Sequence, residues 1–206
     1  MIFSSKLIED AVAEFSKLPG IGKKTALRMV LHLLNANVNE VDVFSSTIAR
    51  MRHEIKFCKS CHNVSDTDEC TVCSNPGRNR SQVCVVENFR DIIAIESTQQ
   101  YSGLYHVLGG LIAPLDGIGP EQLKIDTLVE RVKKDEIKEL IMAISPNVEG
   151  DTTIYYIAKK LKEMPVSITT IARGISFGGE LEYADEMTLA KSISKRLPVE
   201  NYVNVR

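Results

Sequence analysis

Four cysteines lie within sixteen residues of this 206-residue chain, in two pairs of the form Cys-x2-Cys. Cys58 pairs with Cys61 and Cys70 with Cys73, and eight residues separate the two pairs. Four thiolates can converge on one tetrahedral ion, and sulfur ligands suit zinc. A shell of four sulfurs leaves no open coordination position, so the spacing predicts one structural zinc ion per chain. An iron–sulfur cluster or a redox pair is the alternative.

Two other residues near this cluster receive structural interpretations. Cys84 lies inside an apolar run, and we expect it to be a small core residue. His62 directly follows a ligand cysteine. We expect His62 to be a solvated loop residue rather than a fifth ligand.

The second group that could do chemistry is the turn at residues 18–22 (Leu-Pro-Gly-Ile-Gly), which two lysines follow. Its glycines allow a sharp turn, and the next helix then begins with free N–H groups that can bind a phosphate. Lys24 and Arg28 lie four residues apart and project from one helical face beside these amides. This arrangement predicts a helix-hairpin-helix element that holds a DNA backbone without reading bases. The predicted DNA-binding residues are Gly20, Gly22, Lys23, Lys24 and Arg28.

Two other interpretations of this turn exist. An ordinary helical hairpin with solvated lysines would have the same glycines. Residues 22–25 (Gly-Lys-Lys-Thr) also look like a P-loop, but the required earlier glycine is missing and a helix precedes the turn instead of a strand. The P-loop interpretation is therefore rejected.

Acidic side chains follow two of the predicted strands. Glu87 follows the first strand directly and Asp91 comes one helical turn later, while residues 145–151 after the third strand include Glu149 and Asp151. If those strands are neighbours, the four carboxylates could share one sheet edge and hold Mg²⁺ for phosphodiester chemistry. The alternative is that Asp151 caps its helix and that the others are solvated. Spacing alone favours this alternative.

The elements that must position these residues follow from the apolar pattern. Apolar residues recur at helical spacing from residue 4 to about residue 55, which predicts three short helices separated by turns at residues 19–20 and 35–39. Residues 57–80 have no periodicity and almost nothing apolar to bury. This segment therefore needs a metal to hold its shape.

Strands and helices alternate after residue 81, which predicts an α/β layer with a mostly parallel sheet. The apolar, glycine-rich link at residues 108–120 is predicted to be a docking surface rather than a slack loop. The predicted strands cover residues 83–86, 106–108, 140–144 and 166–172. The predicted helices cover residues 89–96, 121–134 (with Pro120 in the first turn), 151–164 and 187–196.

Composition and charge restrict the class of protein. The chain is 44% apolar, and no apolar run reaches the roughly 18–20 residues that span a bilayer, so we expect a soluble intracellular protein. The net charge is −2, but residues 1–80 carry 11 basic and 9 acidic side chains, while residues 81–206 carry 14 and 18. A mildly basic front part therefore precedes an acidic back part.

In their order along the chain, these motifs closely resemble the RecR family of bacterial recombination mediators. The hairpin, the four cysteines and the first strand with Glu87 are followed by residues 114–120, 148–151 and 178–185, so the resemblance covers essentially the whole chain. It implies a multi-part α/β protein. The implied parts are a helix-hairpin-helix DNA-binding domain at residues 1–55, a zinc finger at 56–80, a Toprim domain at 81–175 and a C-terminal oligomerisation or assembly region at 176–206.

The resemblance also implies the function: non-enzymatic mediation of recombinational DNA repair. It implies a ring-shaped homotetramer around DNA, in the cytoplasm and associated with the nucleoid. The protein would act with RecO and RecF to promote loading of RecA at single-stranded gaps. Lys24 and Arg28 match the basic positions of the family's hairpin, and the four cysteines match its zinc ligands. An adaptor that never contacts DNA is a further alternative.

Glu87 matches the first acid of the Toprim pattern, but the catalytic Asp-x-Asp pair is absent. Ser145, Asn147, Glu149 and Asp151 stand in its place. We therefore expect Mg²⁺ to be inessential and the acids Glu87, Asp91, Glu149 and Asp151 to be vestigial or to dock protein partners. The enzyme alternative is a Mg²⁺-dependent nuclease or primase-like activity that uses these same four acids.

Overall fold

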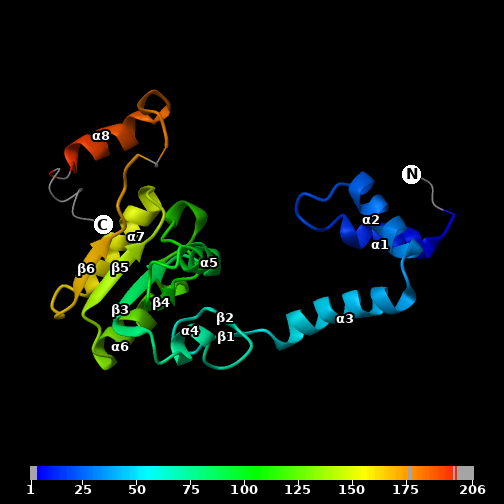
Figure 1. Ribbon diagram of the computed structural model, residues 1–206, viewed down its shortest axis with the longest axis horizontal. Coiled ribbons are helices and arrows are strands. Elements are labelled where there is room, and N and C mark those ends of the chain that lie inside the picture. The colour runs from blue at the N-terminus through cyan, green and yellow to red at the C-terminus, as the bar shows by residue number, and fades with distance from the viewer. Residues whose placement is uncertain (1–3, 176–177, 197, 199–206) are drawn as a thin grey trace. The chain divides into compact units, whose positions relative to one another are not determined.

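The computed structural model describes residues 4–175, 178–196 and 198. The chain divides into two compact units, Met1–Ile55 and Lys56–Arg206 (Figure 1). None of the helices in the described ranges is long and apolar enough to cross a membrane.

The first unit contains the three predicted helices: α1 (Lys6–Phe15), α2 (Lys23–Asn35) and α3 (Val38–Glu54). Helices α1 and α2 pack around a small core in which Val12, Ala26 and Val30 are buried. Helix α3 begins after Asn37, whose side chain accepts a hydrogen bond from the Asn39 amide, and it buries no residue within the unit. The apolar pattern therefore predicted the helices correctly, although only two of them share a core.

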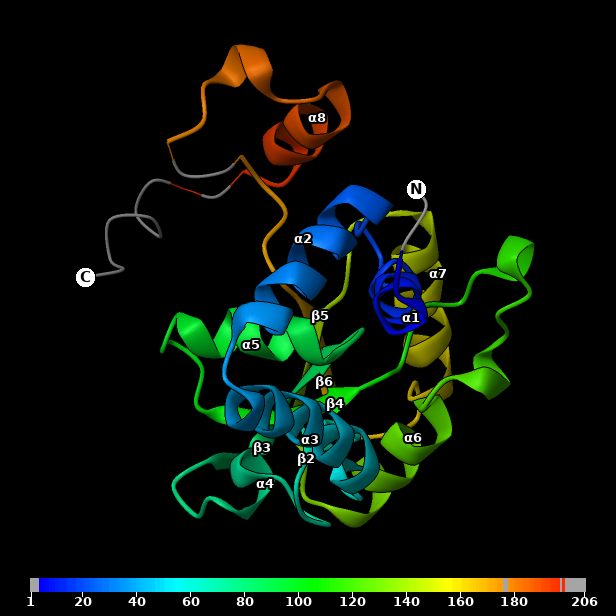
Figure 2. The same ribbon diagram turned by 90° about the vertical axis from the view of Figure 1, so that its right-hand side faces the viewer.

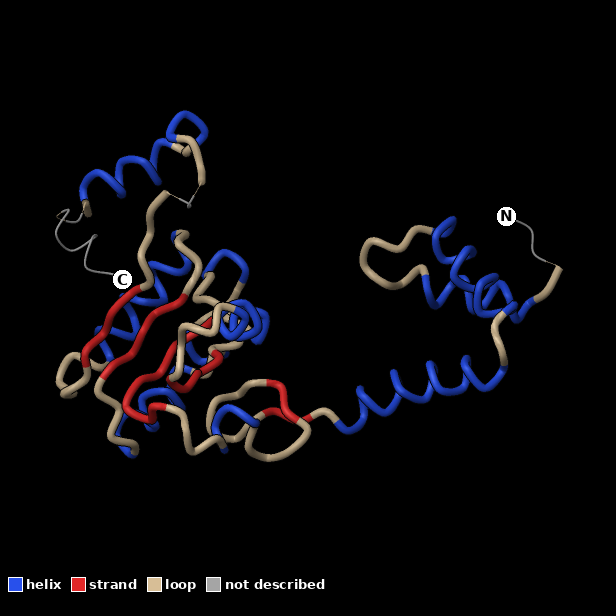
Figure 3. The backbone as a smooth tube through the Cα atoms, viewed as in Figure 1, coloured by secondary structure: helices blue, strands red, loops and turns tan. Residues whose placement is uncertain are grey.

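The second unit begins with a small finger, which comprises residues 56–78. Most of the finger is loop, as the tan tube in Figure 3 shows. Its regular elements are short: an antiparallel pair formed by β1 (Lys56–Phe57) and β2 (Val64–Ser65), and the single-turn helix α4 (Thr71–Ser74). The segment without periodicity is therefore held mainly by its cysteines.

The rest of the second unit is built on a four-stranded parallel sheet in the order β4-β3-β5-β6. This confirms the predicted α/β class. Val83 on the central strand lies opposite Leu104 on one side and Leu140 on the other. The strands are β3 (Asn79–Val86), β4 (Gly103–Val107), β5 (Glu139–Ala143) and β6 (Ser167–Thr170).

Helices cover both faces of this sheet (Figures 1 and 2). Alternate residues of β3 point to opposite faces, as the pleat requires. Val83 and Val85 join the larger core, which α6 (Ile125–Lys134) and α7 (Val148–Lys160) cover. Cys84 and Val86 join the smaller core under α5 (Phe89–Ser97), so the expectation that Cys84 is a core residue is confirmed.

Several predicted boundaries were wrong, among them those of α6, α7 and β4. Pro120 begins a separate 3₁₀ turn (Pro120–Gln122), and α6 starts only at Ile125, because Leu123 is extended and the Lys124 amide donates to the Leu108 carbonyl at 2.9 Å. Helix α7 starts three residues earlier than predicted, and β4 ends at Val107 after starting at Gly103. The start of α6 thus depends on a contact with a distant segment, whereas the start of α7 is set locally by its Asn147 cap.

The end of the chain contains a 3₁₀ turn (Leu181–Tyr183) and helix α8 (Glu186–Ser194), which corresponds to the predicted short helix. Parts of the predicted C-terminal region, residues 176–177, 197 and 199–206, lie outside the described residues.

Candidate nucleic-acid interface and metal centre

The turn between α1 and α2 presents a row of uncovered backbone amides. Gly20 has φ +78°, a left-handed conformation that glycine adopts without strain. Gly22 is the N-cap of α2 but contributes no capping side chain, and the first helical hydrogen bond runs from Ala26 to Gly22. The amides of residues 23–25 thus have no partner within the helix. A Cβ at either glycine would meet nothing within 4 Å, so the turn is uncrowded at both glycines. A helix start with free amides of this kind can bind a phosphate.

Basic side chains flank these amides. Lys23, Lys24 and Arg28 are exposed, and none forms a salt bridge within the part of the chain that the structure describes. The other lysines of this hairpin differ: Nζ of Lys6 lies 2.9 Å and Nζ of Lys17 lies 2.6 Å from a carboxylate oxygen of α1. The positive charge that is free to meet an anion therefore gathers at the start of α2.

The four cysteines form one buried cluster. Their sulfurs all lie within 4.8 Å of one another, and each side chain is at most 3% exposed. The sulfurs of Cys61 and Cys70 are 3.6 Å apart. Ligands at about 2.3 Å from a tetrahedral zinc are separated by about 3.8 Å, so this donor set fits zinc. Within the described residues, this is the only group of three or more potential metal ligands.

Backbone geometry holds the cysteines in place. The Cys58 amide donates to the Asn63 carbonyl at 2.8 Å, and the His62 amide donates to the Cys58 carbonyl at 2.9 Å. His62 itself has φ +62°, which closes this knuckle. Hydrogen bonds with Cys61 and Cys73 lower the pKa of Cys70, whereas the hydrogen bond with Cys70 raises the pKa of Cys61.

The finger is fastened to the sheet by hydrogen bonds. The Val107 amide at the end of β4 donates to the Cys61 carbonyl at 2.8 Å. The Arg80 guanidinium donates to the Cys73 carbonyl at 3.2 Å. Two of the four metal ligands are therefore tied through their own carbonyls to the α/β part of the unit.

His62 contributes to this contact, so its interpretation as a solvated loop residue was wrong. It is half-buried, its Nε2 lies 2.9 Å from Thr127 Oγ1, and its ring meets the ring of His106 edge-on at 5.2 Å. Burial lowers the pKa of His106 to about 3, and its Nε2–H donates to the Lys124 carbonyl at 2.8 Å. The neutral imidazole is therefore a structural part of the contact.

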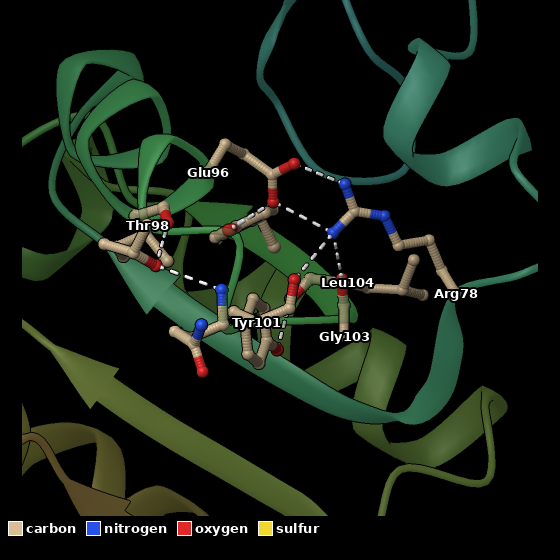
Figure 4. A network of polar contacts seen from close by, with 9 residues as sticks. Arg78, Glu96, Thr98, Tyr101, Gly103 and Leu104 are labelled. Carbon is tan, nitrogen blue, oxygen red and sulfur yellow. Dashed lines mark hydrogen bonds and ion pairs between the residues drawn. The ribbon is translucent and has the colours of Figure 1, made fainter.

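A second set of contacts connects the finger to the sheet through Arg78, the last residue of the finger (Figure 4). Its guanidinium binds both carboxylate oxygens of Glu96 and also donates to the backbone carbonyls of Tyr101 and Gly103 at 3.3 and 3.4 Å. The Tyr105 hydroxyl donates to the same carboxylate at 2.6 Å. One arginine thus ties the finger to α5 and β4.

The four acids Glu87, Asp91, Glu149 and Asp151 do not form one cluster at the sheet edge. Strands β3 and β5 are neighbours, and the Ser145 hydroxyl after β5 donates to Glu87 at 3.2 Å. Asp91, however, accepts from the Asn88 amide in the capping box of α5, and Asp151 pairs with Arg173. Within the described residues, no three of the four carboxylates come close enough together to share one ion.

The suggestion that Asp151 caps its helix was wrong. Asn147 is the N-cap of α7, and its side chain accepts from the Gly150 amide at 2.7 Å. The turn is tight, because a Cβ on Gly150 would lie 2.0 Å from the Ser145 carbonyl oxygen. Glycine is therefore required where α7 begins.

Models of known protein families match four consecutive segments of the chain. They are described as RecR helix-hairpin-helix (residues 8–52), RecR four-cysteine zinc finger domain (55–75), Toprim domain (81–172) and RecR C-terminal (174–196).

Curated relatives named "Recombination protein RecR" align over nearly the full length. The protein from Bacteroides thetaiotaomicron is 58% identical, and the one from Phocaeicola vulgatus is 57% identical, each over 94% of this chain and 95% of the relative. The protein from Flavobacterium johnsoniae is 56% identical over 97% of both. The chain belongs to the RecR family. Its finger is a four-cysteine zinc finger and its sheet belongs to a Toprim domain.

The structure of this RecR-family chain also assigns roles to residues that spacing did not indicate. Arg78, Glu96 and His106 join the finger to the Toprim domain, yet they are far apart in sequence and belong to no local motif. A buried charge needs a partner, but that rule does not say which of 27 acids it would be. Only the folded chain brings them together.

Proposed function

We propose that this protein is a non-enzymatic mediator of recombinational DNA repair that grips the DNA backbone with the start of α2. The observation that carries this proposal is the row of free amides at residues 23–25 beside Lys23, Lys24 and Arg28, which form no salt bridge within the described residues. Amides and cations of this kind bind phosphates without reading bases. The names of the relatives support the same cellular process.

The finer parts of the proposal concern assembly. The protein would form a ring-shaped homotetramer around DNA in the cytoplasm, associated with the nucleoid, and would act with RecO and RecF to load RecA at single-stranded gaps. One hairpin per subunit offers few cations, but several weak sites on one DNA molecule reinforce one another. The four matched family segments support a division into domains at residues 1–55, 56–80, 81–175 and 176–206.

The Toprim domain would dock partner proteins rather than catalyse a reaction. Among its acids, Asp91 and Asp151 are already engaged in a cap and an ion pair. Glu87 and Glu149 are half-buried at the edge beyond β3 and β5, where they could meet a basic partner. The scattered arrangement of the four carboxylates supports this role over Mg²⁺ chemistry.

Two experiments on the full-length protein test these proposals. The double variant Lys24→Ala, Arg28→Ala should bind single-stranded and duplex DNA more weakly, with a shallower dependence of affinity on salt. The matched control Lys6→Ala, Lys17→Ala removes paired cations and should bind like the parent. Equal DNA binding by the first variant and the parent would indicate an adaptor that does not use this hairpin.

Enzymatic activity is tested separately. Nicking, joining and primer synthesis should be absent with Mg²⁺ or Mn²⁺. Any turnover that disappears in Glu87→Gln would identify the protein as a Toprim enzyme instead.

A further inference from the structure

A cavity of about 410 Å³ lies where the zinc finger meets the Toprim domain. Phe57 and Val64 of the finger line one side, and Phe89 and Val107 of the Toprim domain line the other. The volume falls within the range of about 300–1,000 Å³ that is typical of ligand pockets. The hairpin grip proposed above makes no use of this cavity.

The two phenylalanines present large apolar faces to solvent. Phe57 is 66% exposed and Phe89 is 44% exposed. Each ring comes from a different domain, and the hydrogen bond from the Val107 amide to the Cys61 carbonyl fixes the finger beside the end of β4. Exposed aromatic groups at a cavity mark a place where a partner completes the burial. The occupant is therefore expected to offer a flat or apolar surface.

The polar side of the cavity restricts the occupant further. Lys124 is the only charged residue among those that line it, and it forms no salt bridge within the described residues. Asn88 also lines the cavity, and its side-chain oxygen is used to cap α5. The site lies beyond the carboxyl ends of β3 and β4, the edge at which open α/β sheets bind ligands. An apolar occupant that carries a negative charge fits this lining best.

We propose that the cavity receives an unpaired base of single-stranded DNA, which stacks on Phe57 and Phe89 while Lys124 contacts the adjoining phosphate. Aromatic stacking accepts every base, so it suits a protein that binds without sequence preference. A paired base inside a duplex is already stacked and could not enter. An apolar peptide side chain would fill the same walls but leave Lys124 without a counter-charge. This inference rests on the proposed DNA-binding function, and it adds a preference for single strands.

The test compares binding of a fluorescently labelled thymidine oligonucleotide with binding of a duplex of the same length, by anisotropy, using the full-length protein. Phe57→Ala and Phe89→Ala should each weaken single-strand binding by about 5-fold or more, the low end of the loss expected for one stacked base. Duplex affinity should stay within about twofold of the parent. Phe57→Tyr should retain single-strand binding, whereas Phe57→Leu, which is apolar but not aromatic, should lose it.

Charge and stacking are separated by salt. Lys124→Gln should reduce the slope of log affinity against log salt by about one for single strands, whereas the phenylalanine variants should leave the slope unchanged. Tyr155→Ala is the matched control, since Tyr155 is an aromatic residue on α7 that is 71% exposed. This variant should bind both DNAs like the parent. Zinc content of one ion per chain confirms that each variant is folded at the finger.

The possible failures are distinguishable. If Phe57→Ala and Phe89→Ala bind single strands as the parent does, the cavity does not hold a base. The inference is then overturned in favour of an apolar side chain of a protein partner as the occupant. If Lys24→Ala, Arg28→Ala still weakens binding in that case, the proposed function stands without this site. A loss for Phe57→Ala that is equal on duplex and single strand would also overturn the inference, because a base-stacking site must discriminate between them.

Discussion

Arg78 and Glu96 form a two-pronged ion pair that joins the end of the zinc finger to the last turn of α5 (Figure 4). Their side chains are only 15% and 31% exposed. The Tyr105 hydroxyl also donates a hydrogen bond to the carboxylate of Glu96. The orientation of the finger on the Toprim domain thus depends on a charge contact that is largely shielded from solvent.

Glu96→Gln should destabilise the second unit by about 1–3 kcal/mol at pH 7, because Arg78 then loses its charged partner. Arg78, followed by Tyr105, holds the pKa of Glu96 below its usual range. This stabilisation is present above the carboxyl's unfolded pKa of about 4.3 and is lost as pH falls through the lower folded pKa. Urea unfolding should therefore show that parent and variant converge in acid. Glu163→Gln, an exposed control, should stay within about 0.5 kcal/mol of the parent. A constant difference down to pH 2 would contradict this account.

Cys70→Ser should abolish stoichiometric zinc binding, since three thiolates cannot close the tetrahedral shell. Because folding of the finger is coupled to the metal, protease cleavage within residues 56–78 should increase. Metal analysis and limited proteolysis measure the two effects. Cys84→Ala is the control: this cysteine is buried in the sheet, and burial raises the pKa of its thiol to about 12. It should retain one zinc per chain, and a parent protein that contains no zinc would refute the assignment.

The two glycines of the hairpin should fail in different ways. Gly20→Ala places a side chain at φ +78° and should destabilise the first unit by about 1–2 kcal/mol. Gly22 has φ −80°, which alanine adopts readily, so Gly22→Ala should leave the unit about as stable. Its methyl group would be added directly before the amides of residues 23–25, where it would crowd a bound phosphate and should weaken DNA binding. Thermal unfolding and anisotropy separate the effects, and unaltered DNA binding by Gly22→Ala would argue against a phosphate at this turn.

Gly150→Ala should destabilise the Toprim domain by about 1–3 kcal/mol, because the added carbon would overlap the Ser145 carbonyl oxygen unless the start of α7 moves. Gly174→Ala is a matched control, since its nearest new contact would be an ordinary 3.8 Å from Ser192. Urea unfolding compares the two. Equal stability of both variants would show that the loop after β5 adjusts freely.

Local chemistry was enough to predict several parts of this molecule. Two Cys-x2-Cys pairs can place four thiolates around one tetrahedral ion, so their spacing alone predicted that they converge on a zinc site. The two glycines at residues 18–22 predicted a sharp turn, and Gly20 adopts the positive φ that such a turn needs. The alternation of strands and helices likewise predicted an α/β layer with a mostly parallel sheet, and the structure has a four-stranded parallel sheet.

Other features depend on residues that meet only after folding. The spacing of the acids left open whether four carboxylates share one sheet edge and favoured separate roles; in the fold, Asp91 accepts from the Asn88 amide and Asp151 pairs with Arg173. His62, expected in solvent, packs against His106, which lies far along the chain from it. Such pairings depend on which strand ends adjoin, and no local pattern encodes that.

The sequence by itself determined the zinc ligands and the position of the glycine turn proposed to bind phosphate, because each depends on residues close together in the chain, and the order of its motifs indicated the family. Only the tertiary structure decided how the finger is held on the Toprim domain, which acids remain free, and that Phe57 and Phe89 face one cavity. The reason is physical: burial and charge pairing are set by distances in space, and those distances exist only once the strands have packed.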